Sequence, residues 1–198
     1  MAFIQNTAFE ARVANGEFNT LENVTGLFQT SSENDICSAG FLVKQNGLMP
    51  NEGYTGVNNE NSWLMTAAEA TDLVDTPIFA CNTYNVQELT DGSGAVFKVG
   101  ASTLGLAVPA GEPATFTHII FDGMHHYRFG IGNLSAAISS NQYFTIANGL
   151  LVPAAAAPTA NGAPYFKLLG TGNFTEGNRN SFTYYDVVAM TAIGTVGG

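Results

Sequence analysis

The chain has 198 residues, of which 45% are hydrophobic and only 11% are charged, and its formal net charge is −10. This length fits one domain, or one domain with an arm. Disordered chains combine low hydrophobicity with high charge, so the opposite balance here predicts a folded protein. Direct binding of nucleic acid needs clustered Lys and Arg to displace counterions. Six scattered basic residues therefore exclude nucleic acid and anionic lipid as expected partners.

The N-terminal zone, residues 1–35, is predicted to be an arm. Its opening MAFIQNTAFEARV has neither the basic segment nor the apolar run of a signal peptide. No apolar run in the chain approaches the roughly 18 residues of a membrane span. Large apolar residues stand singly among polar ones in the arm, which suits docking on a neighbour, although they could equally cover this chain's own core. The partner-binding candidates are Phe3, Ile4, Phe9, Phe18 and Phe28.

Two short helices are expected. TAAEATDLV, residues 66–74, begins with Thr66 followed by Glu69, a spacing that matches a capping box. AFEARVANG, residues 8–16, ends in a glycine that can close a helix.

The rest of the chain has the pattern of an antiparallel β protein. Short runs rich in Val, Ile, Phe, Tyr and Thr alternate with Asn-Gly or Asp-Gly pairs at 15–16, 46–47, 91–92, 122–123, 148–149 and 161–162. These dipeptides suit the positive φ angles of hairpin turns. Residues 36–198 are therefore predicted to be a β-rich domain, mixed over 36–75 and densely stranded over 76–198. The expected fold class is mainly β, an antiparallel β-sandwich or barrel with the arm and the short helices.

All three histidines lie in HIIFDGMHHYRFG, residues 118–130. Taken as a hairpin with a two-residue turn at Asp122-Gly123, this stretch would place His118 and His125 diagonally on one face and His126 on the other. Catalytic zinc usually needs three protein ligands, and Asp122 is used by the turn. We therefore expect histidines that pack or face solvent, and no metal site. A shift of one residue in the pairing would change which histidines share a face.

Other catalytic patterns are missing from the sequence. It contains no nucleophile-elbow motif, and DGSGAVFKVG lacks the Lys-Ser/Thr ending of a phosphate loop. Cys37 and Cys81 are expected to be buried free thiols, with a single disulfide between them as the alternative. The expectation is a non-enzymatic protein with no catalytic residues and no cofactor.

Three segments resemble the small virion proteins of tailed bacteriophages, in particular capsid decoration (cement, or auxiliary head) proteins. These segments are MAFIQNTAFEARVANGEFNT at the start, GLAVPAGEPATFTHI at 105–119 and GNFTEGNRNSFTYYDVVAM at 172–190. The resemblance is one of style and composition over most of the chain and transfers no functional residue. It implies a protein of the capsid exterior, made in the host cytoplasm, that binds the major capsid protein as a homo-oligomer such as a trimer and stabilises the shell.

Two other functions stay open at this stage. Tail-tube and fibre proteins share the same style. A carbohydrate-binding β module would use exposed aromatic residues, for which the candidates are Trp63 and the tyrosines 127, 143, 165, 184 and 185. Aromatic residues on strands more often belong to the core.

Overall fold

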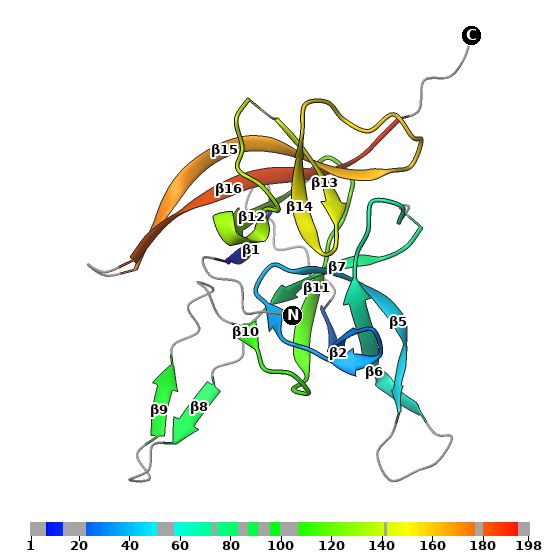
Figure 1. Cartoon of the computed structure of the whole chain (residues 1–198), viewed down its shortest axis with the longest axis vertical. Coiled ribbons are helices and arrows are strands. Elements are labelled where there is room, and N and C mark those ends of the chain that lie inside the picture. The colour runs from blue at the N-terminus through cyan, green and yellow to red at the C-terminus, as the bar shows by residue number, and fades with distance from the viewer. Residues whose placement is uncertain are drawn as a thin grey trace.

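The structure, a computed structural model, describes residues 7–13, 23–50, 58–72, 75–82, 87–90, 96–99, 107–140, 142–176 and 180–193. The fold is mainly β, as predicted from the sequence, and its strands form two larger assemblies, one above the other in Figure 1. The only helical element among the described residues is a short 3-10 turn, Ile131–Asn133.

The upper assembly is a six-stranded antiparallel sheet. Its strand order is β1-β12-β16-β15-β13-β14. The bounds are Phe9–Val13 for β1, His125–Gly130 for β12, Tyr143–Ala147 for β13, Leu150–Ala154 for β14, Pro164–Glu176 for β15 and Asn180–Thr191 for β16. The long β15–β16 hairpin curves across the top of the molecule (Figure 1).

The lower assembly is a small closed barrel. Strands β11, β7, β5, β6 and β2 pair in that order, and β11 pairs in turn with β2, which closes the ring. All of these pairings are antiparallel except the parallel pair of β2 and β6. The strands are β2 (Asn23–Thr30), β5 (Leu42–Pro50), β6 (Asn58–Ala67), β7 (Ile78–Asn82) and β11 (Ala114–His118), with β3 (Glu33–Asn34) added beside β2.

Two further pairs complete the described strands. β4 (Cys37–Ser38) pairs with β10 (Ala107–Val108) next to the barrel. β8 (Gln87–Thr90) and β9 (Val96–Val99) form a hairpin that stands away from the body at the lower left of Figure 1.

Strands β5 and β7 serve two hydrophobic cores, because successive strand residues point to opposite faces. Val43, Phe79 and Cys81 point into the barrel, where they pack with Phe28, Phe41, Met65 and Phe116. Leu42, Ile78 and Ala80 point outward and pack against the sheet, in a core that also contains Phe9, Tyr127, Phe129, Phe144 and Phe166. The shared strands fix the sheet onto one side of the barrel.

The β13–β14 turn is hydrogen-bonded to the barrel assembly. Asn148 and Gly149 have φ angles of 48° and 73°, so this Asn-Gly pair is the tight hairpin turn that the sequence predicts. The backbone of Gly149 donates to Ala68 and accepts from Leu42, at 2.9 Å in both cases. The hairpin tip is thus hydrogen-bonded to the barrel segments that carry Leu42 and Ala68.

Both predicted helices are wrong. In the segment 8–16, residues 9–13 are strand β1, since Phe9 pairs with Phe129 and packs in the sheet core. Residues 14–16 lie outside the described residues. In the segment 66–74, Thr66 and Ala67 end strand β6, and residues 68–72 form a turn. The backbone N–H of Glu69 donates to the Asp72 carboxylate at 2.7 Å. Residues 73 and 74 lie outside the described residues.

The predicted arm also needs correction, because much of it belongs to the folded body. Strands β1 and β2 both fall within residues 1–35, and they complete the sheet and the barrel respectively. The side chains of Phe9 and Phe28 are 1% and 2% exposed. For these two residues the alternative prediction, that they cover this chain's own core, is the one that holds.

Candidate functional site

The histidine-containing stretch is a crossover between the two assemblies, and the predicted hairpin is wrong. Strand β11 pairs with β7 and β2 in the barrel, whereas β12 pairs with β1 and β16 in the sheet. Residues 119–124 connect them. The histidines therefore separate: the His118 ring lies 5.1 Å from the Phe79 ring in the barrel, while His125 and His126 occupy β12.

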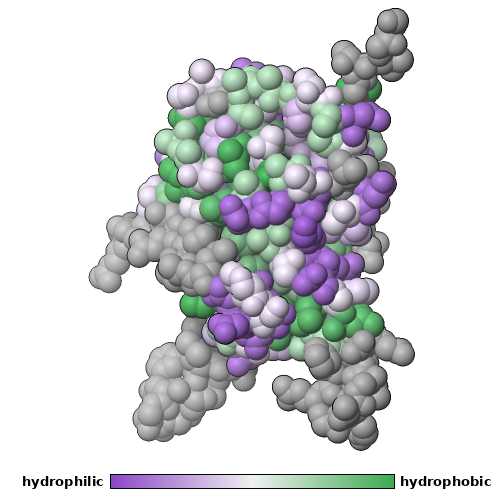
Figure 2. Space-filling model, turned by 45° about the vertical axis from the view of Figure 1, so that its right-hand side comes forward, coloured by the Kyte–Doolittle hydropathy of each residue, from purple (hydrophilic) through white to green (hydrophobic). Residues whose placement is uncertain are grey.

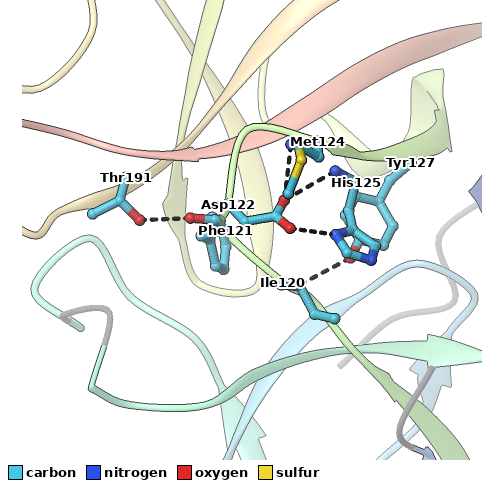
Figure 3. Close-up of polar contacts among 7 residues, drawn as sticks. All are labelled: Ile120, Phe121, Asp122, Met124, His125, Tyr127 and Thr191. Atoms are coloured by element: carbon cyan, nitrogen blue, oxygen red, sulfur yellow. Dashed lines mark hydrogen bonds and ion pairs between the residues drawn. The ribbon is translucent and has the colours of Figure 1, made fainter. Parts of the chain in front are cut away.

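Asp122 holds the crossover turn together (Figure 3). Its Oδ1 accepts the backbone N–H groups of Met124 at 2.8 Å and His125 at 3.0 Å, and its Oδ2 lies 2.8 Å from Nδ1 of the His125 ring. Partial burial opposes the charge, but the two backbone hydrogen bonds and the His125 ring outweigh it, so the pKa of Asp122 is lowered. The expectation that Asp122 would serve the turn is confirmed.

The crossover also makes hydrogen bonds to the sheet and to the barrel. The Gly123 N–H donates to the Ala189 carbonyl at 2.9 Å, and the Thr191 hydroxyl donates to the Phe121 carbonyl at 2.9 Å. The Ile120 N–H donates to the hydroxyl of Tyr127 on sheet strand β12 at 2.9 Å. On the barrel side, the Ile119 N–H donates to the carbonyl of Ile78 on β7 at 2.8 Å. Burial raises the pKa of Tyr127 to about 12. Hydrogen bonds from the crossover therefore link the sheet to the barrel.

The pairing of Asp122 with His125 resembles the orienting pair of a general base, in which a carboxylate holds one imidazole nitrogen and leaves the other free. However, Nε2 of His125 is enclosed, with less than 1 Å² accessible and no hydrogen-bond partner among the described residues. A general base must reach the proton that it removes. In this conformation the pair can support the crossover but cannot touch a substrate.

A shallow recess of about 270 Å³ lies beside the crossover. Its lining includes the polar residues Thr76, His118 and Asp122 and the apolar residues Ile78, Ile120 and Phe121. Within the described part of the chain, no three His, Cys, Asp or Glu side chains gather as metal ligands would. The tyrosines and Trp63, proposed above as sugar-stacking candidates, do not line this recess.

Most of those aromatic candidates are used in packing. Tyr127, Tyr165 and Tyr185 are buried, and Trp63 packs against the barrel core. Tyr143 packs beside Tyr165. Tyr184 lies beneath the guanidinium of Arg128, with Cζ 3.6 Å from the ring centroid.

Arg128 is a site that the sequence reading missed, since it looked like one scattered base among six. Its guanidinium binds Asp186 through two hydrogen bonds of 2.8 and 3.0 Å and Glu10 through one of 3.2 Å. Burial disfavours the charge, but the hydrogen bonds and charge of Asp186 outweigh this effect and raise the pKa of Arg128. Glu10, Arg128 and Asp186 lie on three neighbouring strands of the sheet, β1, β12 and β16. Only the register of these strands, absent from the sequence, could have revealed it.

Asn133 is a second residue that the sequence reading missed. Its side chain is buried and bonds three separate segments: its Oδ1 accepts from the N–H groups of Ala8 and Gly130, and its Nδ2 donates to the Ala39 carbonyl at 2.7 Å. It thus connects the start of β1, the end of β12 and the segment before β5.

The remaining candidates are placed as follows. Cys37 and Cys81 are free, buried thiols in the barrel core, as expected. Phe9 and Phe28 are in the cores, so neither side chain is available to a partner in this fold. Phe3, Ile4 and Phe18 lie outside the described residues, and their partner-binding role stays a prediction.

No family model, curated protein or solved structure matches the chain. Among the described residues, no helix has the length and apolarity to cross a lipid bilayer.

Proposed function

We propose that this chain is a non-catalytic structural protein that decorates the exterior of a tailed-bacteriophage capsid and stabilises the shell by binding its major capsid protein. The resemblance of the three segments quoted above suggests the virion setting. The feature of the fold that supports a binding role is the far end of the β15–β16 hairpin.

That end is a two-stranded ribbon. Strand β12 pairs with β16 over Tyr184 to Val188, and β13 pairs with β15 at Phe166 and Lys167. Beyond these positions, residues 173–176 and 180–183 pair only with each other among the described strands, and the ribbon extends past the body at the left of Figure 1. An isolated two-stranded ribbon is marginally stable in water. Its edges offer backbone groups that a partner's strand can pair with.

The rest of the fold suits the same role. Two packed cores that share strands give a stiff body, and a stiff body loses little conformational freedom when it binds. On the face drawn in Figure 2, hydrophilic residues gather across the middle, and apolar residues are scattered above and below them. A capsid presents many equivalent sites, so modest contacts by each copy of an oligomer multiply through effective concentration.

The direct test is sedimentation with particles. Virions stripped of this chain are mixed with the tagged protein, and bound protein is measured in the pellet. We expect saturable binding to heads by the full chain. A variant in which an Asn-Gly turn joins Gly172 to Tyr184, replacing residues 173–183, should lose most of this binding. A matched control shortens the β8–β9 hairpin instead.

Three results would count against the proposal or its parts. Absence of binding by the full chain contradicts the decoration role, and binding to tails rather than heads would assign the chain to the tail. Unchanged binding by the shortened β15–β16 variant would remove the ribbon from the interface. Deletion of residues 1–6 tests the predicted roles of Phe3 and Ile4. A deletion of residues 1–30 cannot test the arm, because it removes β1 and all of β2 from the folded body.

A further inference from the structure

The two thiols of the chain meet inside the barrel. Cys37 and Cys81 are 44 positions apart in sequence, and the Cys81 Sγ lies 3.9 Å from the Cys37 carbonyl oxygen. Both residues are buried, at 1% and 0% exposed, and belong to one core cluster. Their contact is therefore a long-range contact of the native fold.

The backbone on both sides fixes this contact. Cys81 is held between Phe116 of β11, its register partner, and the segment before β5, where its N–H donates to the Phe41 carbonyl and its carbonyl accepts from Gly40. Cys37 is paired with Val108 across the short β4–β10 ladder. Neither residue is on a free end, so the two cysteines stay neighbours while the barrel is closed.

We propose that Cys37 and Cys81 form an intramolecular disulfide when the chain folds, or transiently opens, in the presence of a small disulfide oxidant such as glutathione disulfide. One cysteine thiolate attacks the oxidant and releases one glutathione. The second cysteine attacks the resulting mixed disulfide and releases the other. The two thiol protons and two electrons leave on the two glutathione molecules, so the step balances.

The closed barrel keeps the thiols unreactive in the absence of such opening. Burial raises the pKa of the Cys37 thiol, so the reactive thiolate is scarce. The chain therefore folds with free thiols under reducing conditions, and the bond forms only where an oxidant is present as the barrel closes or opens. This inference stands apart from the capsid proposal, because it depends only on the barrel.

The bond would tie β4 to β7 and restrict the unfolded chain over a long loop. Long-loop disulfides stabilise small proteins by limiting the unfolded ensemble. For a chain of this size we expect the midpoint of thermal unfolding to rise by about 5–15 °C.

The experiment compares the full chain refolded from denaturant with glutathione disulfide and with excess reductant. We expect the oxidised sample to lose two hydrogens in intact mass, to leave no thiol free for a thiol reagent, and to yield one peptide containing both cysteines. Its unfolding midpoint should rise as stated and return on reduction. The variants Cys37→Ala and Cys81→Ala, refolded identically, should show no such rise.

Free thiols in the correctly folded oxidised sample would overturn the proposal. So would glutathione adducts that persist on both cysteines, or a disulfide between two copies of the chain. If the alanine variants fold poorly, the wild-type comparison between oxidised and reduced samples still decides the outcome, because it uses one sequence.

Discussion

At the scale of single residues, two polar side chains hold together the segments where the two assemblies join. Asn133 binds three segments from a buried position, and Asp122 organises the crossover turn. Buried polar groups are costly unless they are hydrogen-bonded. Asn133 is buried whereas Asp122 is exposed, so this cost applies to Asn133, whose hydrogen bonds favour one arrangement of sheet and barrel.

The charge of Asp122 makes the stability of the folded protein depend on pH in the acid range. Its pKa in the folded protein is below the ordinary value of 3.8, so its contribution to stability is complete above that value and is lost as pH falls through the folded pKa. We expect Asp122→Asn to lower the free energy of unfolding by roughly 1–3 kcal/mol at neutral pH. The gap between wild type and variant should shrink below pH 3.8.

Urea unfolding measured from pH 7 to pH 3 checks this prediction. Glu112→Gln serves as the control, because Glu112 is exposed and should give a gap near zero at every pH. A gap for Asp122→Asn that stays constant, or widens, towards acid would show that the carboxylate is not stabilised by the turn.

Gly149 and Gly123 provide a matched pair in turns, with φ angles of 73° and 79°. A Cβ at Gly149 would lie 2.3 Å from the Phe41 ring and 2.8 Å from the Leu42 carbonyl, whereas a Cβ at Gly123 meets nothing within 4 Å. Both alanine variants carry the strain of a left-handed residue, about 1–2 kcal/mol. Only Gly149→Ala adds overpacking, about 1–3 kcal/mol. Equal losses in chemical denaturation would show that the hairpin tip is not packed against the barrel.

At the scale of elements, the barrel depends on a close approach between its two parallel strands. Gly26 of β2 pairs with Trp63 of β6. A Cβ at Gly26 would lie 2.6 Å from the Met65 side chain and 2.9 Å from the Trp63 carbonyl. The strand contact therefore requires a residue without a side chain at this position.

We expect Gly26→Ala to destabilise the protein by about 1–3 kcal/mol through overpacking. The control is Gly170→Ala, at a strand irregularity in β15 where a Cβ meets nothing within 4 Å. This control should be neutral or stabilising by about 0.5–1 kcal/mol, because glycine weakens a strand interior. Thermal unfolding of both variants makes the comparison, and a neutral Gly26→Ala would argue against the barrel as described.

The sequence predicts the type of most elements but not their partners. The Asn-Gly pair at 148–149 forms the hairpin turn that was expected, because the two positive φ angles are a local property. Asp122-Gly123 also turns the chain, yet the strands on either side join different assemblies. Local turn chemistry cannot specify which strand a run of residues will pair with, since pairing is decided by distant contacts.

The same reason explains the wrong helices and the missed sites. Residues 8–16 and 66–74 contain good helix formers, but Phe9 pairs with Phe129 and Thr66 pairs with Lys44. Tertiary pairing thus outweighs the weak helix propensity. The groups around Arg128 and Asn133 depend on register across strands more than one hundred residues apart, which no spacing in the sequence displays.

At the scale of the whole molecule, the chain is a sheet fixed to a closed barrel by shared strands, with hairpins that reach beyond the body (Figure 1). The packed sheet and barrel form a stiff scaffold, and the hairpins project from it. The proposed role uses both: the scaffold resists deformation, and the projecting β15–β16 ribbon offers backbone groups to a partner. Mechanical support of a shell by many copies requires these two properties together.

Electron cryomicroscopy of intact particles that carry this chain tests the account most directly. We predict regularly repeated density on the outer surface of the head that fits the sheet and barrel, with residues 173–183 in contact with the shell. Particles whose heads have no such density, or in which the chain occupies the tail or the interior, would contradict the account.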